Sequence, residues 1–299
     1  MAFKFFDYIK NIVDPEYGLT LFNSILQLGY LEDLGPNANS CLTTDALSDK
    51  DKKTIVKGHL FLKSPGIICG LEVFEFIFNH NTNKCNFEFL FNDGSQINDC
   101  PLVIAKVETT AENFLKKERL ALNVIQHMSG IATQTKLLTD LVKPFGISIR
   151  DTRKTLPGLR IFEKYAVTTG NGINHRQGLY DKILIKDNHI KLVGSLIKTL
   201  EKFQNIDNIQ IEIASLDDLN KLKKFGGTNI KSILLDNMKP NDIRKALDIC
   251  QGQYHIEVSG GITPDNLKDY LIKGIDTISI GYLTHSPKSL DYSLKLDII

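Results

Sequence analysis

Arginine, paired cysteines and long apolar runs are all scarce in this sequence, and each shortage excludes a class of protein. No apolar run approaches the roughly 20 residues that a helix needs to span a bilayer, so we expect no membrane-spanning segment. The net charge of +1 gives no overall field to attract nucleic acid or an anionic membrane surface, so any anion site must be local. The first residues, MAFKFFDYIKNIVDPEYG, carry acids early and lack a small-residue cleavage site, and we expect no secretory signal there.

The five cysteines are odd in number, and no two of them form a C-x-x-C pair. Cys69 and Cys250 lie in apolar settings that are typical of reduced thiols in a core. A metal or disulfide role for the cysteines is the alternative. The pattern favours a reduced protein of the cytoplasm.

Lysine is the usual cation of this chain, which has six arginines against thirty lysines. Four of the six arginines nevertheless fall in residues 150–190, together with several other cationic side chains. They are Arg150, Arg153, Arg160 and Arg176, with Lys154, His175, Lys186 and His189. Arginine is hard to replace where a planar fork must hold a carboxylate or phosphate with two hydrogen bonds. The cluster therefore predicts a site for a polyanionic small molecule, although a solvated basic face is the simpler alternative.

Roughly the first hundred residues predict a small α+β unit with mostly antiparallel strands and no catalytic constellation. Apolar spacing favours a helix over 18–34, and a tight turn that runs into a helix over 65–78. Apolar runs rich in β-forming residues predict strands over 54–63, 85–91 and 101–108.

A long helix is predicted next, over 110–128, with Thr110 as its N-cap. Arg119 lies on this helix and, taken alone, is as readily an ordinary surface cation as a functional one. The small residues SGIAT at 129–133 favour close helix packing.

From about residue 146 the pattern becomes an alternation of strand and helix. The strand candidates are 146–151, 182–188, 209–215, 232–237, 255–261 and 277–282. Helix signals begin at Ser215, at Lys239 and at Thr263-Pro264, the last over residues 263–274. Parallel strands joined by helices form either a doubly wound sheet or a barrel. Six or seven strands are fewer than the eight of a complete barrel.

Polar residues recur at the carboxyl ends of the late strands, at Glu212, Asp236, Ser259 and Gly281. In a barrel these ends converge on one face, so they should share a mouth with the cations of residues 150–190. Glu212 and Asp236 are each embedded in an apolar strand, where a carboxylate is costly unless it pairs with a cation or holds a metal. Carboxylates from separate strands suit Mg²⁺ with a phosphate substrate as co-ligand, and structural salt bridges with lysines are the alternative.

The segment SGGIT at 259–263 predicts a phosphate-binding loop. Its glycines let backbone N–H groups approach a phosphate, and the helix expected to follow would add a partial positive charge. A plain strand-to-helix turn is the alternative reading of the same residues.

Several long motifs occur in a fixed order: ERLALN-x3-MSGIAT, DTRKT-PGLR, G-G-NHR-GLYD, LIKDNHI, E-SGGIT and ISIG-LTHS. In this order the chain resembles the quinolinate phosphoribosyltransferase family, most densely over 118–286. The resemblance implies an α/β fold: an incomplete barrel of six to seven parallel strands with an N-terminal α+β open-sandwich domain. It implies domain limits of 1–117 for the sandwich, joined by 286–299, and 118–285 for the barrel.

The resemblance also implies the reaction. Phosphoribose would pass from phosphoribosyl pyrophosphate (PRPP) to quinolinate with decarboxylation, giving nicotinate mononucleotide, pyrophosphate and CO₂ with Mg²⁺ as cofactor. It implies a homodimer, and the arginine of the ER-x-ALN helix, here Arg119, would reach the site from the neighbouring subunit. A higher oligomer is compatible with this expectation.

Position by position, the resemblance assigns residues to quinolinate, to PRPP, to Mg²⁺ and to catalysis. Those for quinolinate are Arg119, Thr152, Arg153, Lys154, His175, Arg176 and Lys186. Those for PRPP and its phosphate are Glu212, Asp236, Ser259, Gly260, Gly261, Ser279, Ile280, Gly281 and His285. Glu212 and Asp236 would also hold Mg²⁺, partly through water or PRPP, and the catalytic set would be Lys154, Lys186, Glu212 and Asp236.

The chain departs from the family pattern at a few positions. An early G-D-x-T-T is replaced by SCLTT at 40–44, the usual triple glycine before NHR reads Gly170-Asn171-Gly172, and Leu156 stands where Thr is frequent. Asn tolerates a left-handed backbone better than most residues, so Asn171 affects only loop detail. The rival interpretations are the molybdenum-transport-associated member of the family and a non-catalytic anion-binding barrel. Intact DTRK and KDNH segments favour the quinolinate enzyme over the first, and the presence of both Glu212 and Asp236 favours it over the second.

Overall fold

The computed structural model describes residues 4–12, 14–81, 85–226 and 229–298 and divides the chain into two compact units. Unit 1 comprises Met1–Lys136, Thr155–Asn171 and Ser286–Ile299, and unit 2 comprises Leu137–Lys154 and Gly172–His285. The second unit of this division begins at Leu137; the domain limits expected from the sequence stay a prediction.

Unit 1 contains an antiparallel sheet in the order β12-β1-β5-β3. Its strands are β1 (Ile55–Leu62), β3 (Asn86–Phe89), β5 (Leu102–Thr110) and β12 (Tyr292–Ile298). Every second residue of β1 is buried, as expected for a sheet with one face against a core. Gly58 of β1 makes room for the packing helix: a Cβ there would lie 2.5 Å from the ring of Phe114. The three strands predicted from the sequence in this part are therefore present.

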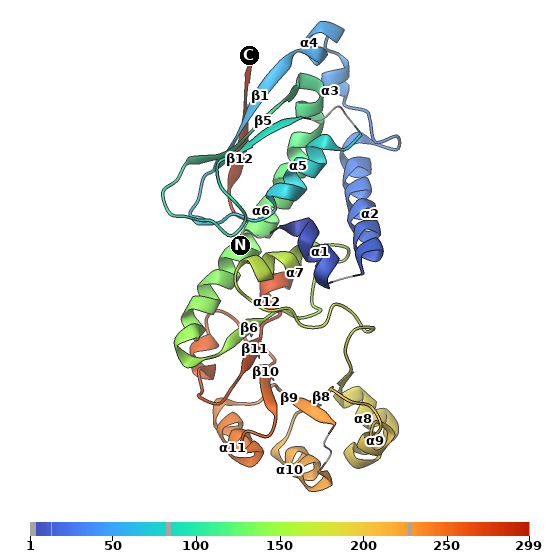
Figure 1. The fold of residues 1–299 in the computed structure, drawn as a ribbon, viewed down its shortest axis with the longest axis vertical. Helices are drawn as coiled ribbons and strands as arrows, with labels where there is room; N and C mark the ends of the chain where they lie inside the picture. The colour runs from blue at the N-terminus through green and yellow to red at the C-terminus, as the bar shows by residue number, and fades with distance from the viewer. Residues whose placement is uncertain (1–3, 13, 82–84, 227–228, 299) are drawn as a thin grey trace. The chain divides into compact units, whose positions relative to one another are not determined.

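Helices pack around this sheet within unit 1 (Figure 1). They are α1 (Phe5–Ile12), α2 (Pro15–Leu34), α3 (Leu42–Asp45), α4 (Asp49–Lys53), α5 (Leu71–Asn79), α6 (Ala111–Val142), whose residues from Leu137 onward belong to unit 2, and α7 (Arg160–Thr169). A short pair, β2 (Gly66–Ile67) and β4 (Gln96–Ile97), precedes and follows α5. Asp14 caps α2 by accepting a hydrogen bond of 2.9 Å from the amide of Tyr17. The aromatic core includes Phe5, which stacks on Phe162 at a centroid distance of 5.4 Å.

Helix α6 is longer than the sequence predicted, because the small residues at 129–133 continue it. Thr110 acts as the expected cap, accepting a hydrogen bond of 3.3 Å from the amide of Asn113. At Gly130 a Cβ would lie 2.1 Å from the carbonyl oxygen of Lys288, so only glycine permits the approach of that backbone. The close packing predicted for this stretch is present: the extended segment before β12 lies against Gly130, and the C-terminal end of α7 lies against Ala132.

Unit 2 contains a six-stranded parallel sheet in the order β6-β11-β10-β9-β8-β7. Its strands are β6 (Ser148–Arg150), β7 (Leu184–Ile185), β8 (Ile209–Ile213), β9 (Ile230–Asp236), β10 (His255–Ser259) and β11 (Thr277–Ser279). From β7 to β11, strands that are consecutive in the chain are neighbours, and β11, the last of them, also pairs with β6, the first strand of the unit. A complete barrel would also pair β6 with β7; no ladder joins them within the described residues, so the barrel is open. The α/β class and the incomplete barrel expected from the sequence are confirmed.

Helices follow most of these strands in unit 2. They are α8 (Asp187–Val193), α9 (Leu196–Lys202), α10 (Leu216–Phe225), α11 (Pro240–Cys250) and α12 (Tyr282–His285), with 3₁₀ turns η1 (Lys143–Phe145) and η2 (Leu267–Tyr270). Ser215 caps α10 as predicted, accepting from the amide of Asp218 at 3.1 Å.

The helix predicted over 263–274 is wrong, because only the single turn η2 forms there. The side chain of Asn266 takes up the backbone groups that would start a helix. It accepts from the amide of Thr263 at 2.8 Å and donates to the carbonyl of Gly261 at 3.0 Å. Such local hydrogen bonds compete with helix formation.

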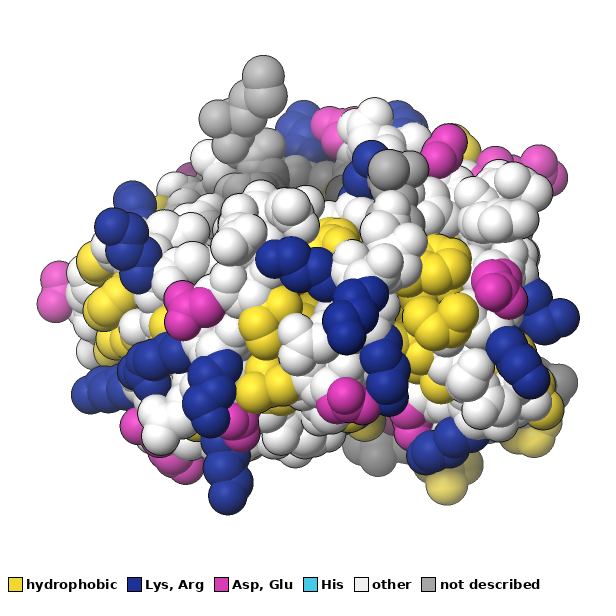
Figure 2. Space-filling view, turned by 90° about the horizontal axis from the view of Figure 1, so that it is seen from below, with side chains coloured by type: hydrophobic (Ala, Val, Ile, Leu, Met, Phe, Trp, Pro, Cys, Tyr) yellow, Lys and Arg dark blue, Asp and Glu magenta, His cyan; other side chains and the backbone are white. Residues whose placement is uncertain are grey.

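Charges of both signs are interspersed with apolar patches on the face shown in Figure 2, in keeping with the net charge of +1. None of the helices in the described parts of the chain has the length and apolarity to cross a membrane.

Candidate active site

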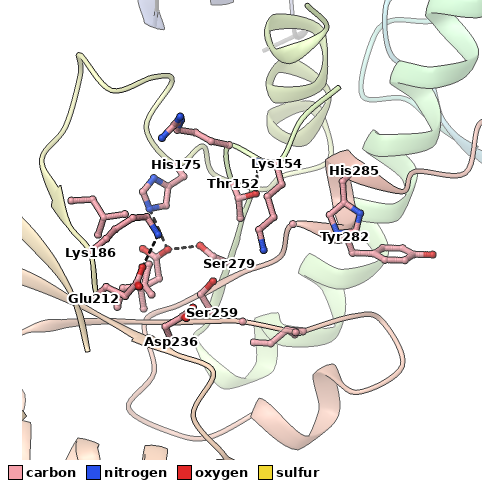
Figure 3. A pocket seen from close by; sticks show the side chains of 18 of the residues that line it. Thr152, Lys154, His175, Lys186, Glu212, Asp236, Ser259, Ser279, Tyr282 and His285 are labelled. Carbon is pink, nitrogen blue, oxygen red and sulfur yellow. Dashed lines mark hydrogen bonds and ion pairs between the residues drawn. The ribbon is translucent and has the colours of Figure 1, made fainter. Parts of the chain in front are cut away.

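A cavity of about 400 Å³ opens at the carboxyl ends of the parallel strands of unit 2. Its lining residues all belong to this unit. They are Thr152, Arg153, Lys154, His175, Arg176, Leu184, Lys186, Glu212, Leu234, Asp236, Glu257, Ser259, Gly260, Gly261, Ile262, Thr263, Ser279, Gly281, Tyr282 and His285. Lys154, His175 and Lys186 point into the space above Glu212, Asp236 and Ser259 (Figure 3).

One half of the cavity is cationic, and its loops are held by buried hydrogen bonds. The carboxylate of Asp151, which is fully buried, accepts from the amide of His175 and from the side chain of Asn174, both at 2.7 Å. These bonds tie the loop after α7 to the end of β6. Burial, and then the neighbouring charge of Arg153, lower the pKa of Arg176. Two guanidinium groups close enough to repel each other favour a bound anion.

His175 is fixed in orientation as well as in position. Its Nδ1 accepts a hydrogen bond of 2.7 Å from the amide of Arg176, so a neutral ring carries its proton on Nε2. The Arg176 guanidinium in turn donates to the carbonyl oxygen of Lys182 at 3.1 Å. These contacts orient the two side chains before any ligand arrives.

The other half of the cavity is acidic. The ammonium group of Lys186 lies 2.7 Å from Oε2 of Glu212, which is the penultimate residue of β8. Burial, and then the charge of Glu212, raise the pKa of Asp236, the last residue of β9. Asp236 accepts a hydrogen bond of 2.6 Å from the side chain of Asn237. The salt-bridge alternative considered for these acids is thus realised at Glu212.

The residues present fit Mg²⁺, but only together with a ligand. Within the described ranges, no group of three or more His, Cys, Asp or Glu side chains is placed to hold a metal ion by itself. Burial and the charge of Glu212 make the ionised form of Asp236 costly, as its raised pKa shows, and a bound cation would relieve that cost. Mg²⁺ is commonly held by one or two carboxylates and the phosphates of a substrate, which is the donor set available here.

Glycine loops close the remaining side of the cavity. Gly260 has φ = +101°, and a Cβ there would lie 2.4 Å from the side-chain oxygen of Asn237 and 2.6 Å from its amide nitrogen. Gly281 lies against Lys154, whose side chain would be 3.0 Å from a Cβ at that position. The left-handed backbone and close enclosure of Gly260 require glycine, whereas a side chain at Gly281 would only require Lys154 to shift slightly. Both glycines line the cavity. Because η2 is a single turn, no helix end supplies the extra positive charge that the sequence suggested.

Glu257 lines the floor of the cavity and was not anticipated from the sequence. Its side chain is fully buried and accepts from Arg150 at 2.6 Å, from Gln210 at 2.8 Å and from Ser279. Burial opposes its ionisation, but the charges of His175 and Arg150 hold the pKa of Glu257 below its usual range. An acid inside an apolar strand was the signal used for Glu212 and Asp236, and the run HIEVS carries the same signal.

The cavity brings together fourteen of the sixteen site residues expected from the sequence: Thr152, Arg153, Lys154, His175, Arg176, Lys186, Glu212, Asp236, Ser259, Gly260, Gly261, Ser279, Gly281 and His285. Ile280 is fully buried, and its amide donates to the carbonyl of Arg150 at 2.9 Å. Arg119 is an exposed residue of α6 in unit 1. The arginines Arg150 and Arg160, also part of the sequence cluster, bind Glu257 and Thr155 instead.

Comparison with known proteins decides the family. Residues 131–295 match the C-terminal domain of quinolinate phosphoribosyl transferase, and residues 42–129 match its N-terminal domain. The chain belongs to the quinolinate phosphoribosyltransferase family. The fold, the family and the enzyme class expected from the sequence are confirmed.

Relatives of this family match over nearly the whole chain. The chain is 33% identical to the chloroplastic nicotinate-nucleotide pyrophosphorylase [carboxylating] of Arabidopsis thaliana, over 97% of this chain and 86% of the relative. It is 36% identical to the probable nicotinate-nucleotide pyrophosphorylase [carboxylating] of Bacillus subtilis, over 90% of this chain and 91% of the relative. The crystal structure of NadC from Streptococcus pyogenes superposes with a TM-score of 0.84 at 34% identity and covers 93% of this chain and 97% of that one.

The departures from the family pattern are accommodated locally in unit 1. Asn171 adopts φ = +66°, the left-handed conformation that asparagine was expected to tolerate. The preceding Gly170 is tightly enclosed, because a Cβ there would lie 2.4 Å from the carbonyl oxygen of Ala132. In SCLTT, Cys41 precedes α3, where hydrogen bonding to Thr44 lowers the pKa of its thiol.

Proposed function

We propose that this protein transfers phosphoribose from PRPP to quinolinate with decarboxylation, giving nicotinate mononucleotide, pyrophosphate and CO₂. The observation that carries the proposal is the division of a single cavity into a cationic half and an acidic half bordered by glycine loops. Quinolinate carries two ring carboxylates and PRPP carries a sugar with phosphates, so each half matches one substrate.

In this proposal quinolinate lies against the cationic half. Arg153 and Arg176 supply planar forks, and Lys154, His175 and Lys186 supply further donors around the ring carboxylates. Thr152 supports the set, because its hydroxyl accepts from the amide of Lys154 at 3.0 Å. Several fixed donors against two carboxylates give specificity for a dicarboxylic acid over its monocarboxylic analogue.

PRPP lies against the acidic half and the glycine loops. Glu212 and Asp236 face the ribose and would hold Mg²⁺ together with the pyrophosphate, partly through water. When bound, Mg²⁺ neutralises charge on the pyrophosphate leaving group. The 5′-phosphate lies at Ser259, Gly260 and Gly261, with Ser279, Gly281 and His285 on the opposite loop. The amide of Ile280 already donates within the sheet, so its part is to hold that loop in place.

Each step of the reaction uses residues in this arrangement. The pyridine nitrogen forms a bond to C1 of the ribose as the bond from C1 to pyrophosphate breaks. Lys154 and Lys186 lie where they can stabilise the anionic groups during this transfer. The carboxylate next to the now cationic nitrogen then leaves as CO₂, its electron pair stays on the ring carbon, and a proton from water replaces it. The protein's main contribution to this second step is to hold geometry.

The active unit in this proposal is a homodimer in which Arg119 completes the quinolinate site of the partner subunit, with a higher oligomer as an extension. Arg119 suits that role because it is exposed on α6. All five cysteines are free thiols, which supports a reducing compartment, here proposed to be the cytoplasm.

Product formation by the purified protein tests the proposal. With quinolinate, PRPP and Mg²⁺, we expect nicotinate mononucleotide and CO₂ in equal amounts, and no product when nicotinate replaces quinolinate. The Arg176→Ala variant should lose activity, whereas Arg244→Ala, an exposed arginine on α11, should keep it. No product from quinolinate would contradict the proposal and leave an anion-binding barrel or the molybdenum-transport-associated type, and product from nicotinate would point to another substrate.

A further inference from the structure

Glu257 contacts four parts of unit 2 through the two oxygens of one carboxylate, three of them by hydrogen bonds and His175 by an ion-pair contact. Oε2 accepts from Arg150 at the end of β6 at 2.6 Å and from Gln210 on β8 at 2.8 Å. Oε1 accepts from the hydroxyl of Ser279 at the end of β11, and His175 Nε2 lies 3.5 Å from it. The carboxylate itself stands on β10, so it connects four strands or loops beneath the cavity.

The two oxygens have different neighbours. The partners of Oε2, Arg150 and Gln210, do not line the cavity, whereas the partners of Oε1, His175 and Ser279, both do. His175 lies in the cationic half and Ser279 lies beside the glycine loops. Oε1 is therefore the point at which the two substrate halves are joined to one rigid group.

The buried charge of Glu257 is neutralised without a ligand. Its side chain has no exposed surface, and an isolated carboxylate in such a place is costly. Arg150 supplies the opposite charge at short range from the side away from the cavity. Because Arg150 balances the charge of Glu257 within the protein, Glu257 need not bind substrate. Its other oxygen, Oε1, is left to contact His175 and Ser279.

We propose that Glu257 is a positioning residue that sets the separation between the quinolinate half and the phosphoribosyl half of the cavity. It does so by holding His175 and Ser279 on one carboxylate oxygen. The inference rests on the proposed function for the names of the two substrates. A positioning error of about 1 Å between two reacting groups can cost on the order of 10²-fold in rate.

The Glu257→Gln variant keeps the shape of the side chain but replaces one acceptor oxygen by a donor. The charged Arg150 should hold the amide oxygen, so the NH₂ group faces His175 and Ser279 and cannot accept from them; both substrate halves then lose their common anchor. We expect kcat/KM to fall by roughly 10²-fold for quinolinate and for PRPP alike, with KM raised for both. Gln210→Met is the matched control, because it removes a partner of Oε2 only; its kcat/KM should stay within about threefold of the wild type.

A second variant separates positioning from simple charge neutralisation. In Arg150→Met/Glu257→Leu, neither charge of the buried pair remains and no acceptor is left for His175 and Ser279, so thermal stability should return toward that of the wild type while the anchor stays absent. If Glu257 positions His175 and Ser279, the raised KM values persist in this stable double variant. If Glu257 only neutralises Arg150, both KM values return to normal with the stability, and the inference is overturned.

The outcomes are distinguishable from failure of the proposed function, because the wild type is assayed first. A wild type that forms no nicotinate mononucleotide removes the proposed function and this inference with it. With an active wild type, normal KM values in a folded Glu257→Gln variant, or a change for one substrate alone, overturn the inference and leave the proposed function intact. Should the single variant fail to fold, the double variant gives the deciding measurement.

Discussion

Lys186 donates a hydrogen bond of 2.7 Å to Oε2 of Glu212, so the cationic and acidic halves of the cavity meet at this ion pair. The lysine side chain is 44% exposed and the glutamate side chain 9% exposed, which leaves the ammonium group accessible to a ligand. The pair places a cation between the two proposed substrates, where charge changes during transfer.

Replacing Lys186 should affect both substrates, whereas replacing Glu212 should affect mainly PRPP. Lys186→Met should lower kcat/KM for both quinolinate and PRPP by roughly 10²-fold, because the lysine faces both. Glu212→Gln should raise KM for PRPP and the Mg²⁺ requirement while KM for quinolinate changes little. Lys191→Met, which breaks an exposed lysine–aspartate pair on α8, is the control and should change either constant less than about twofold. A Glu212→Gln effect confined to quinolinate would contradict the assigned role.

Two glycines with nearly the same backbone conformation test the phosphate loop. Gly260 has φ = +101° and is enclosed by Asn237, whereas Gly194 has φ = +99° with no atom within 4 Å of a Cβ. Alanine at Gly194 adds only backbone strain, of about 1 kcal/mol. Alanine at Gly260 adds a steric clash, so we expect a larger loss of the free energy of unfolding and a KM for PRPP raised roughly tenfold or more. Urea denaturation measures the loss of stability in each variant, and steady-state kinetics measure KM for PRPP. If the two variants lose equal stability and Gly260→Ala has a normal KM for PRPP, the loop at Gly260 does not bind the phosphate.

Much of this arrangement could be predicted from the sequence, for physical reasons. Apolar strands that each end in a polar residue, such as Glu212 and Asp236, are required to converge when parallel strands are joined by helices. The clustering of Arg153 and Arg176 in a lysine-rich chain indicated where an anion binds. Gly260 was also indicated by the sequence, because glycines after a strand let backbone N–H groups approach a phosphate. Its left-handed backbone is known only from the structure.

Other features depended on contacts that are distant in sequence. Glu257 and Arg150 are separated by 107 residues, and only the alignment of β6, β11 and β10 brings them together. Arg150 belongs to the arginine cluster in the sequence, but in the structure it binds Glu257 at the floor of the cavity instead of lining it. The predicted helix after Pro264 is missing because the side chain of Asn266 forms hydrogen bonds with backbone groups there. The apolar periodicity of the sequence gives no information about such bonds.

A buried carboxylate in unit 1 gives a test by pH. Burial raises the pKa of Asp93 to about 6, although amide hydrogen bonds from Leu71 and Gly70 and the hydroxyl of Tyr165, 2.7 Å away, favour its charged form. Since the pKa is raised on folding, the stability that Asp93 contributes is full below its ordinary range and is lost as pH rises through about 6.

Tyr165→Phe removes one donor to Asp93 and should raise its pKa further. The variant therefore continues to lose stability above pH 6, so its cost relative to the wild type should grow by roughly 1 kcal/mol as pH rises from about 4.5 to about 7.5. Urea denaturation at both pH values provides the measurement. A cost that does not change with pH would show that the hydroxyl contributes equally to both charge states.

Mixing two inactive variants tests the proposed donation of Arg119 across a dimer. In a heterodimer of Arg119→Ala and Arg176→Ala, one site has its own Arg176 and receives an intact Arg119 from the partner. After subunit exchange, about a quarter of wild-type activity should return, because half of the dimers are mixed and each has one complete site. Unmixed variants processed in the same way are the control. Absence of recovery despite exchanged subunits would place Arg119 in its own subunit's site or outside it.

The most direct measurement is a calorimetric titration of the protein with quinolinate and, separately, with nicotinate. The proposed account requires that the second carboxylate of quinolinate be held by the cations of the cavity, so quinolinate should bind at least roughly 10²-fold more tightly than nicotinate. This preference should be lost in Arg176→Ala and kept in Arg244→Ala. Equal affinities for the two acids, or a preference that survives Arg176→Ala, would contradict the account.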